Sequence, residues 1–210
     1  MTHRPFIICS LFALLLGCRR DKSPPAGPAL FQLLRKADTG LDFENVLRQS
    51  SRFNVFNYMY FYNGGGVGAG DFNKDGLVDL YFTSNMGPNK MFLNQGNLKF
   101  KDVTEQAGVA GCPPALEGIS TDCGWKTGVS IVDINNDGLL DLYVNQLGDY
   151  QSIKGRNQLF ICTGVAGGVP TYEDEAIRYG LDLTGFSTQT AFFDYDLDGD
   201  LDMFQLNHSL

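Results

Sequence analysis

Histidine is nearly absent from this sequence, since only His3 and His208 occur among 210 residues. The sequence therefore gives little support for a His-rich zinc site or a Ser-His-Asp triad. Basic residues are also in the minority, with 16 Lys and Arg against 24 Asp and Glu and a formal net charge of -8. This balance argues against a nucleic-acid partner, because neutralising phosphates requires a basic patch. The 43% hydrophobic residues, 25 Gly, 16 Phe and 9 Tyr instead predict a packed core of short strands joined by tight turns.

The N-terminal apolar run is too short to be a membrane-spanning helix. Residues 6–16 are apolar, whereas a spanning helix needs roughly 20 residues. The run follows Arg4 and closes on Leu-Leu-Gly before Cys18, which predicts a secretory signal. This ending resembles the bacterial lipobox, so we expect a lipoprotein signal peptide over residues 1–17 and lipidation at Cys18. The alternative is an ordinary signal peptide in which Cys18 is incidental.

Export sets the expected environment of the mature chain. Residues 18–30 are polar and Pro-rich and predict a flexible tether. We expect an outer-membrane or cell-surface lipoprotein that meets the membrane through its lipid anchor only, with a periplasmic or secreted protein as the alternative. Cys112 and Cys123 flank a Pro-containing loop, and an oxidising compartment predicts a disulfide between them, although two unpaired thiols remain the alternative. Cys162 lies in an apolar run and is expected to be a buried core thiol.

One acidic pattern, D-x-[DN]-x-D-G-x-x-D, occurs three times, beginning at Asp71, Asp133 and Asp194. The copies are roughly sixty residues apart, a period that indicates a repeat architecture. Oxygens at positions 1, 3 and 5 converge when the chain wraps around a hard cation, and Gly at position 6 permits the sharp turn. Position 7 offers its carbonyl oxygen, and the Asp at position 9 completes the shell.

Calcium is the cation that this donor set predicts. Calcium takes six to eight oxygens in a flexible geometry, magnesium demands a tighter octahedron, and zinc or copper would call for the Cys or His that the loops lack. An Asx-rich turn that binds nothing is the alternative, which three matching copies disfavour. We therefore expect about three calcium ions. The expected ligands are Asp71, Asn73, Asp75, Leu77 and Asp79, then Asp133, Asn135, Asp137, Leu139 and Asp141, and finally Asp194, Asp196, Asp198, Asp200 and Asp202.

The segments around the loops predict strands rather than the helices of an EF-hand. Position 12, which is Glu in an EF-hand, is Phe82, Val144 or Gln205 here. A calcium sensor would need a bistable helix pair, which these flanks do not predict. A second repeat, at residues 89–94 and 157–162, predicts two further strands and a short Gly-ended turn after each of the first two loops. Four strands per unit are typical of a propeller blade.

These residues resemble the FG-GAP/VCBS repeat family, whose unit is the integrin-type propeller blade. The resemblance covers about residues 40–210, and the Gly-rich segment 64–76 with its acidic loop carries it. Phrases at 62–67, 89–94 and 206–209 also resemble the large surface VCBS-repeat lipoproteins of Bacteroidetes-like bacteria. The resemblance implies an all-β fold of four-stranded antiparallel blades with calcium loops over residues 31–210. Family propellers have about seven blades, so about three repeats imply an incomplete propeller and a fragment of a longer protein or a truncated gene.

The implied function is a calcium-binding, non-catalytic module at the cell surface that binds proteins or glycans or serves assembly. The alternative is a calcium-dependent carbohydrate-active enzyme, similar to a polysaccharide lyase, with its active site in the missing part. The aromatic run at residues 53–62 could form a sugar-stacking platform, but strand packing is the favoured interpretation because both of its faces are apolar. His208 is expected to be structural.

Overall fold

The structure of this chain is a computed structural model. It describes most of the sequence that follows the N-terminal segment, namely residues 31–51, 53–111, 124–151 and 153–209. The expected signal peptide and tether, the lipidation residue Cys18 and the expected Cys112–Cys123 disulfide lie outside these ranges. Within the ranges, the structure has no helix long and apolar enough to cross a membrane.

The chain divides into two units, Met1–Leu34 and Arg35–Leu210, and the second unit contains the elements described here. Its first element is the short helix α1, Lys36–Thr39, which ends at Gly40. The strands begin only at Val67, so the expected repeat region opens with irregular chain.

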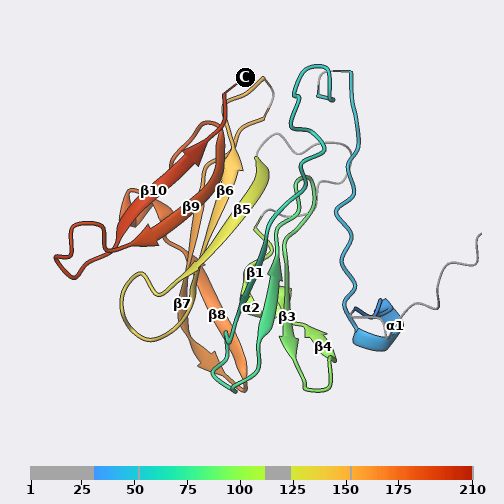
Figure 1. Cartoon of the computed structure of the whole chain (residues 1–210), viewed down its shortest axis with the longest axis vertical. Helices are drawn as coiled ribbons and strands as arrows, with labels where there is room; N and C mark the ends of the chain where they lie inside the picture. Colours follow the sequence, from blue (N-terminus) through green and yellow to red (C-terminus); the bar gives the residue numbers. More distant parts are fainter. Residues whose placement is uncertain (1–30, 52, 112–123, 152, 210) are drawn as a thin grey trace, which may run out of the picture. The chain divides into compact units, whose positions relative to one another are not determined.

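Three antiparallel sheets make up the body of this unit (Figure 1). Two of them have four strands, whose spatial order follows the chain, and each is followed by one turn of helix; the third is a two-stranded hairpin. The first sheet comprises β1 (Val67–Gly70), β2 (Asp79–Phe82), β3 (Lys90–Asn94) and β4 (Phe100–Asp102), followed by α2 (Thr104–Ala107). The second comprises β5 (Trp125–Val132), β6 (Asp141–Leu147), β7 (Gln158–Ala166) and β8 (Val169–Asp174), followed by α3 (Ala176–Tyr179). The third comprises β9 (Ser187–Phe193) and β10 (Asp202–Asn207).

The fold class expected from the sequence is confirmed. The described residues are nearly all β, in an open arrangement of antiparallel sheets as in part of a β-propeller rather than a closed barrel. Each acidic loop joins the first two strands of its sheet, and each four-stranded sheet ends in a turn that closes on a glycine, Gly108 or Gly180. The repeat in the sequence is therefore a repeat of sheets.

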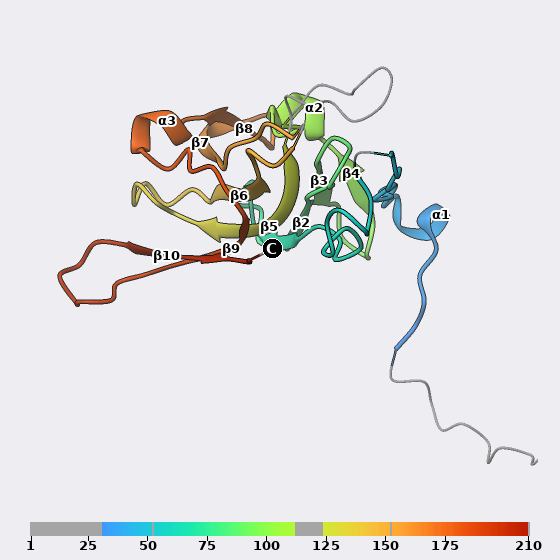
Figure 2. The ribbon, with the colours of Figure 1, turned by 90° about the horizontal axis from the view of Figure 1, so that it is seen from above.

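The main hydrophobic core lies between the first and second sheets. Tyr81 and Met91 from the first sheet and Leu142 and Val144 from the second belong to one buried cluster. A smaller cluster joins Tyr143 on the other face of β6 to the third sheet. Because β6 contacts a neighbouring sheet on each face, all of its residues are buried. Figure 2 shows the hairpin β9–β10 beside β5 and β6, with β7 and β8 farther from the hairpin.

Glycines let the first strands of neighbouring sheets approach closely. A Cβ at Gly66 would lie 2.9 Å from the backbone nitrogen of Val129, and one at Gly68 would lie 2.5 Å from the Ile131 side chain. Side chains then bond across the sheets. The Thr83 hydroxyl donates to the carbonyl of Thr127 at 2.6 Å, and the Thr127 hydroxyl donates to the carbonyl of Ser187 at 2.9 Å. These bonds tie the end of β2 to β5, and β5 to the start of β9.

The expectation of a strand at residues 53–62 is wrong, because this segment forms successive turns. Its backbone turns at Asn54, whose carbonyl accepts the N–H of Tyr58 and whose side chain accepts the N–H of Phe56. Local Asn and Ser bonds of this kind compete with sheet pairing. The turns send Phe53, Tyr58 and Phe61 into a cluster with Trp125, so the packing role is confirmed for these three rings.

Truncating a residue of β6 tests the packing between the sheets. Leu142 is fully buried in the main core, so Leu142→Ala should lower the free energy of unfolding by about 2–5 kcal/mol. Urea unfolding followed by circular dichroism measures the change. Leu206→Ala, on the exposed part of β10, is the matched control and should cost far less. Equal losses in the two variants would contradict the described stacking.

Candidate metal-binding loops

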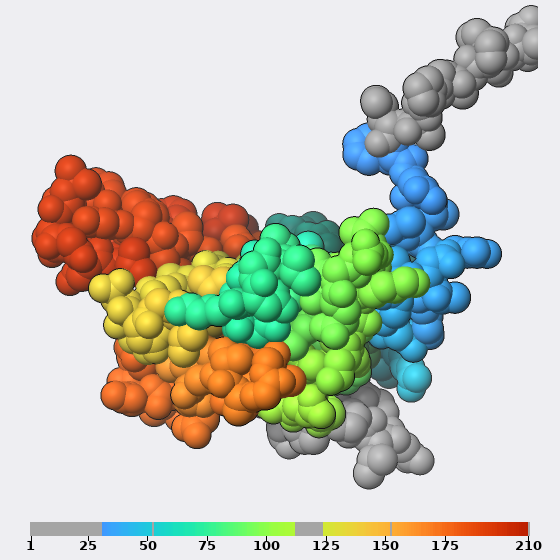
Figure 3. All heavy atoms as spheres, turned by 90° about the horizontal axis from the view of Figure 1, so that it is seen from below, coloured from blue at the N-terminus to red at the C-terminus, as the bar shows by residue number. Residues whose placement is uncertain are grey.

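The three acidic loops occupy equivalent places, each between the first and second strands of its sheet. They span residues 71–78, 133–140 and 194–201. Their central residues are exposed, while Asp79 and Asp141, which follow the first two loops, are fully buried. Figure 3 views the sheets from the end where these loops emerge, with the loop of β9–β10 in red and that of β5–β6 in yellow.

All three loops share one backbone conformation. Position 4 has a left-handed φ in every copy, 60° at Lys74, 56° at Asn136 and 65° at Leu197. Position 6 also has a positive φ and is glycine each time, with 86° at Gly76. The turn favours glycine at position 6, because a φ of 81° to 98° lies beyond the values that the non-glycine residues at position 4 adopt. The sharp turn expected at this glycine is therefore confirmed.

The carboxylate at position 1 closes each loop on itself. Asp71 accepts the backbone N–H of Asp75 on one oxygen at 3.0 Å and that of Gly76 on the other at 2.8 Å. Asp133 and Asp194 accept the equivalent two bonds in their loops. The position-5 carboxylate in turn accepts the N–H of position 7, at 2.7 to 3.1 Å in the three copies. The carboxylates at positions 1 and 5 thus accept backbone N–H groups from within their own loop.

The third loop brings expected ligands together most clearly. Asp194, Asp196 and Asp202 each place a carboxylate oxygen so that all three oxygens lie within 4.8 Å of one another. Beside them, a hydrogen bond with Asp198 and the charge of that neighbour raise the pKa of Asp200. Like charges held this close favour a bound cation, and an all-oxygen set suits a hard divalent ion.

In the first two loops, position 3 is an asparagine that makes local bonds. The Asn73 side-chain oxygen accepts the N–H of Asp75 at 3.2 Å, and its nitrogen donates to the Asp75 carboxylate at 3.0 Å. Asn135 and Asp137 repeat both bonds at 3.1 and 2.9 Å. The amide oxygen therefore lies inside the loop, next to the carboxylates expected to be ligands.

Position 9 has a second role that sequence reasoning missed. Asp79 accepts the N–H of Phe72 at 3.0 Å and, on its other oxygen, the N–H of Asn94 in β3 at 2.7 Å. Asp141 likewise accepts the N–H of Ile134 at 3.0 Å and that of Cys162 in β7 at 2.8 Å. This carboxylate therefore ties the acidic loop to the third strand of its sheet.

Burial raises the free-energy cost of ionising the position-9 carboxylates. Desolvation raises the pKa of Asp79, and it raises the pKa of Asp141 to about 6. The two backbone N–H bonds that each accepts oppose this shift, while the carboxylates at positions 1 and 5 of the same loop reinforce it. A divalent cation in the loop would offset this negative charge, so the residues present fit a bound metal ion.

A buried Asn–Tyr pair occurs in both four-stranded sheets. The second sequence repeat, at residues 89–94 and 157–162, was the signal that could have revealed it. Asn89 donates to the hydroxyl of Tyr81 at 2.8 Å and accepts the N–H of Ser84 at 3.1 Å. Asn157 makes the same bonds to the Tyr143 hydroxyl at 3.0 Å and to the N–H of Gln146 at 2.8 Å. The first asparagine of each repeated phrase therefore fixes the connection between the second and third strands.

Replacing a position-9 aspartate removes both of its acceptor oxygens and should destabilise the protein even when no metal is present. Asp141→Ala leaves the N–H groups of Ile134 and Cys162 without their acceptor, so we expect a loss of about 2–4 kcal/mol. The measurement is urea unfolding in chelator. Asp149→Asn, which removes the charge of an exposed carboxylate paired with Lys154 and suits the left-handed φ of this residue, is the control and should cost at most about 1 kcal/mol. Similar losses in both variants would count against the tie.

Comparisons with known proteins match the region that contains the first two loops. Residues 71–144, from the first loop through most of β6, match the FG-GAP-like repeat family. Over 144 residues, 67% of this chain, the sequence is 30% identical to cartilage acidic protein 1 of Mus musculus and 28% identical to the Homo sapiens protein. The matched part spans 20% of the length of these relatives. The expected similarity to bacterial surface lipoproteins stays a prediction. The comparisons therefore establish similarity to FG-GAP-like repeats across the first two acidic loops of a chain built from propeller-type sheets.

Proposed function

We propose that this chain is a calcium-binding, non-catalytic propeller module that binds a protein or glycan partner at the cell surface. The observation that carries the calcium part is the common geometry of the three loops, in which carboxylate oxygens converge most closely at Asp194, Asp196 and Asp202. In each loop, the side chains at positions 1, 3, 5 and 9 and the carbonyl of position 7 would hold the ion.

The tie at position 9 explains why calcium would act on stability. In the first two sheets the buried carboxylate contacts both its loop and the third strand, so an ion in the loop would also stabilise the strand arrangement. An ion that binds only the native state raises stability by RT ln(1 + [Ca]/Kd), about 2.7 kcal/mol per site at a hundredfold excess. Calcium binding at the loops would thereby be coupled to folding of the protein.

A binding role agrees with the surroundings of the one histidine in the described residues. His208 packs against Tyr60 with ring centroids 4.2 Å apart and shares a 2.9 Å hydrogen bond through Nε2 with the Tyr58 hydroxyl. It is thus engaged with aromatic side chains rather than with a serine or cysteine nucleophile. The surface location in this proposal is supported by the signal-like N-terminus of the sequence.

Equilibrium dialysis of the whole chain against calcium tests the metal sites. About three ions should bind, and Asp196→Ala should remove or weaken one of them while preserving the fold. Asp196 is the suitable target because the backbone bonds within the third loop go to Asp194, Asp198 and Asp202. Asp149→Asn, outside the loops, should leave the stoichiometry unchanged. Wild-type protein that is folded but retains no calcium would overturn the calcium proposal.

Membrane fractionation tests the anchor. Produced with its own N-terminus in a bacterial host, the wild-type chain should enter the membrane fraction, because Cys18 would be acylated. Cys18→Ser should move the protein to the soluble fraction, while Cys162→Ser, at a buried core thiol, should not. Equal partition of the wild type and Cys18→Ser would refute the lipid anchor.

A further inference from the structure

A pocket of about 400 Å³ lies where the first strands of the three sheets come together. Its walls include Gly64–Gly66 just before β1, Thr127 and Gly128 in β5, and Thr188 and Gln189 in β9. These residues are at the starts of the strands, whereas the acidic loops follow the ends of the same strands. The pocket is therefore separate from the candidate metal sites.

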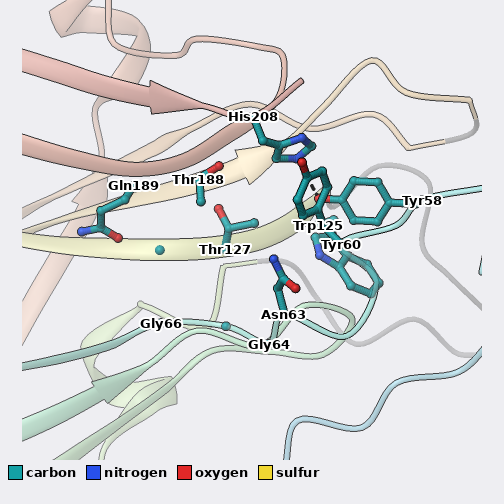
Figure 4. A pocket seen from close by; sticks show the side chains of 12 residues that line it. Tyr58, Tyr60, Asn63, Gly64, Gly66, Trp125, Thr127, Thr188, Gln189 and His208 are labelled. Carbon is teal, nitrogen blue, oxygen red and sulfur yellow. Dashed lines mark hydrogen bonds between the residues drawn. The ribbon is translucent and has the colours of Figure 1, made fainter. Parts of the chain in front are cut away.

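The walls combine neutral polar groups with aromatic rings. Asn63, Thr127, Thr188 and Gln189 contribute amides and hydroxyls, and none of the described lining residues is Asp, Glu, Lys or Arg. Figure 4 shows Thr127 and Thr188 between Gln189 on one side and the aromatic end on the other. Hydroxyls and amides can both donate and accept hydrogen bonds, so they suit a ligand rich in hydroxyl groups.

Two polar atoms at this pocket have no hydrogen-bond partner. The Thr188 hydroxyl and Nδ1 of His208 are both buried and unpaired, and Asn145 Nδ2 is the other such side-chain atom in the described residues. Buried polar groups are nearly always satisfied, and leaving one unpaired is costly. Both atoms belong to residues that line this one pocket, so they are the buried side-chain polar groups of its walls that still lack a partner.

Aromatic side chains close one end of the pocket. Tyr58, Tyr60 and Trp125 line it together with His208, and burial lowers the pKa of that imidazole, which favours its neutral form. A charged ligand would find no counter-charge here, and a purely apolar ligand would leave the Thr188 hydroxyl and Nδ1 of His208 unpaired. A ligand with apolar C–H faces and neutral hydroxyls satisfies both parts of the wall.

We propose that this pocket binds one neutral hexopyranose unit of a glycan. A volume of this size falls within the range of small-molecule sites. Thr188 Oγ1 and His208 Nδ1 would bond to sugar hydroxyls, while the aromatic end would contact the C–H groups of the ring. The inference specifies the partner class of the binding role proposed above and rests on that role, but not on occupied calcium loops.

Trp125 provides the readout, because it is the only tryptophan of the chain and it lines the pocket. The whole chain is titrated with the methyl glycosides of glucose, galactose and mannose, and with methyl glucuronoside as the charged comparison. At least one neutral glycoside should shift the fluorescence of Trp125 in a saturable way. The ring protons of that glycoside should also give saturation-transfer NMR signals. Methyl glucuronoside should bind about tenfold more weakly or not at all, since the walls offer it no counter-charge.

Variants locate the site. Thr188→Val keeps the shape of the side chain and removes one hydroxyl, so it should weaken sugar binding about tenfold. Thr163→Val, which removes an exposed hydroxyl on β7, is the matched control and should bind normally. Should Thr188→Val fail to fold, Asn63→Ala removes an exposed amide of the same wall and should also weaken binding.

Calcium dialysis of the same samples separates the two proposals. Folded protein that binds calcium but none of the neutral glycosides overturns the sugar site alone. Sugar binding without calcium binding supports this pocket and overturns the calcium proposal. Unaltered sugar affinity in both Thr188→Val and Asn63→Ala, or equal affinity for methyl glucuronoside, overturns the assignment of a neutral sugar to this pocket.

Discussion

The arrangement of each four-stranded sheet depends on a carboxylate buried at the start of its second strand. Asp79 and Asp141 accept one N–H from the acidic loop and one from the third strand, so three consecutive segments are fixed by one side chain. Burying a charge in this way is costly, as the raised pKa of Asp141 shows. A cation in the loop would reduce that cost, which links the proposed metal sites directly to the fold.

Stacking of the sheets follows from residues that the acidic loops do not contain. Gly66 and Gly68 allow β1 to approach β5, and the hydroxyls of Thr83 and Thr127 bond to the neighbouring first strand. The two faces of β6 are then buried by different sheets. The same contacts bring the starts of β1, β5 and β9 together and so create the pocket between them. Carboxylates therefore lie at the ends of these strands, whereas the side chains that line the pocket at their starts are neutral.

Local chemistry accounts for what the sequence predicted well. The acidic loop is specified within nine residues by Asp, Asn and Gly, whose side chains and permitted φ values form the turn directly. Strands beside each loop, and the two that follow in each of the first two units, were predictable for the same reason, because short apolar runs ended by turn residues are local signals. The strand expected at residues 53–62 was wrong, because hydrogen bonds at Asn54 outweighed the strand propensity of this aromatic segment.

The sequence alone determined the repeat, its all-β class and the Asp, Asn and Gly residues that build each loop. Only the tertiary structure decided that position 9 also holds the third strand, because its partners Asn94 and Cys162 lie 15 and 21 residues further along the chain. The pocket could not be predicted from the sequence either, because Asn63, Thr188 and His208 meet only when the sheets stack. Contacts between distant residues depend on packing rather than on local spacing, and no pattern within one repeat encodes them.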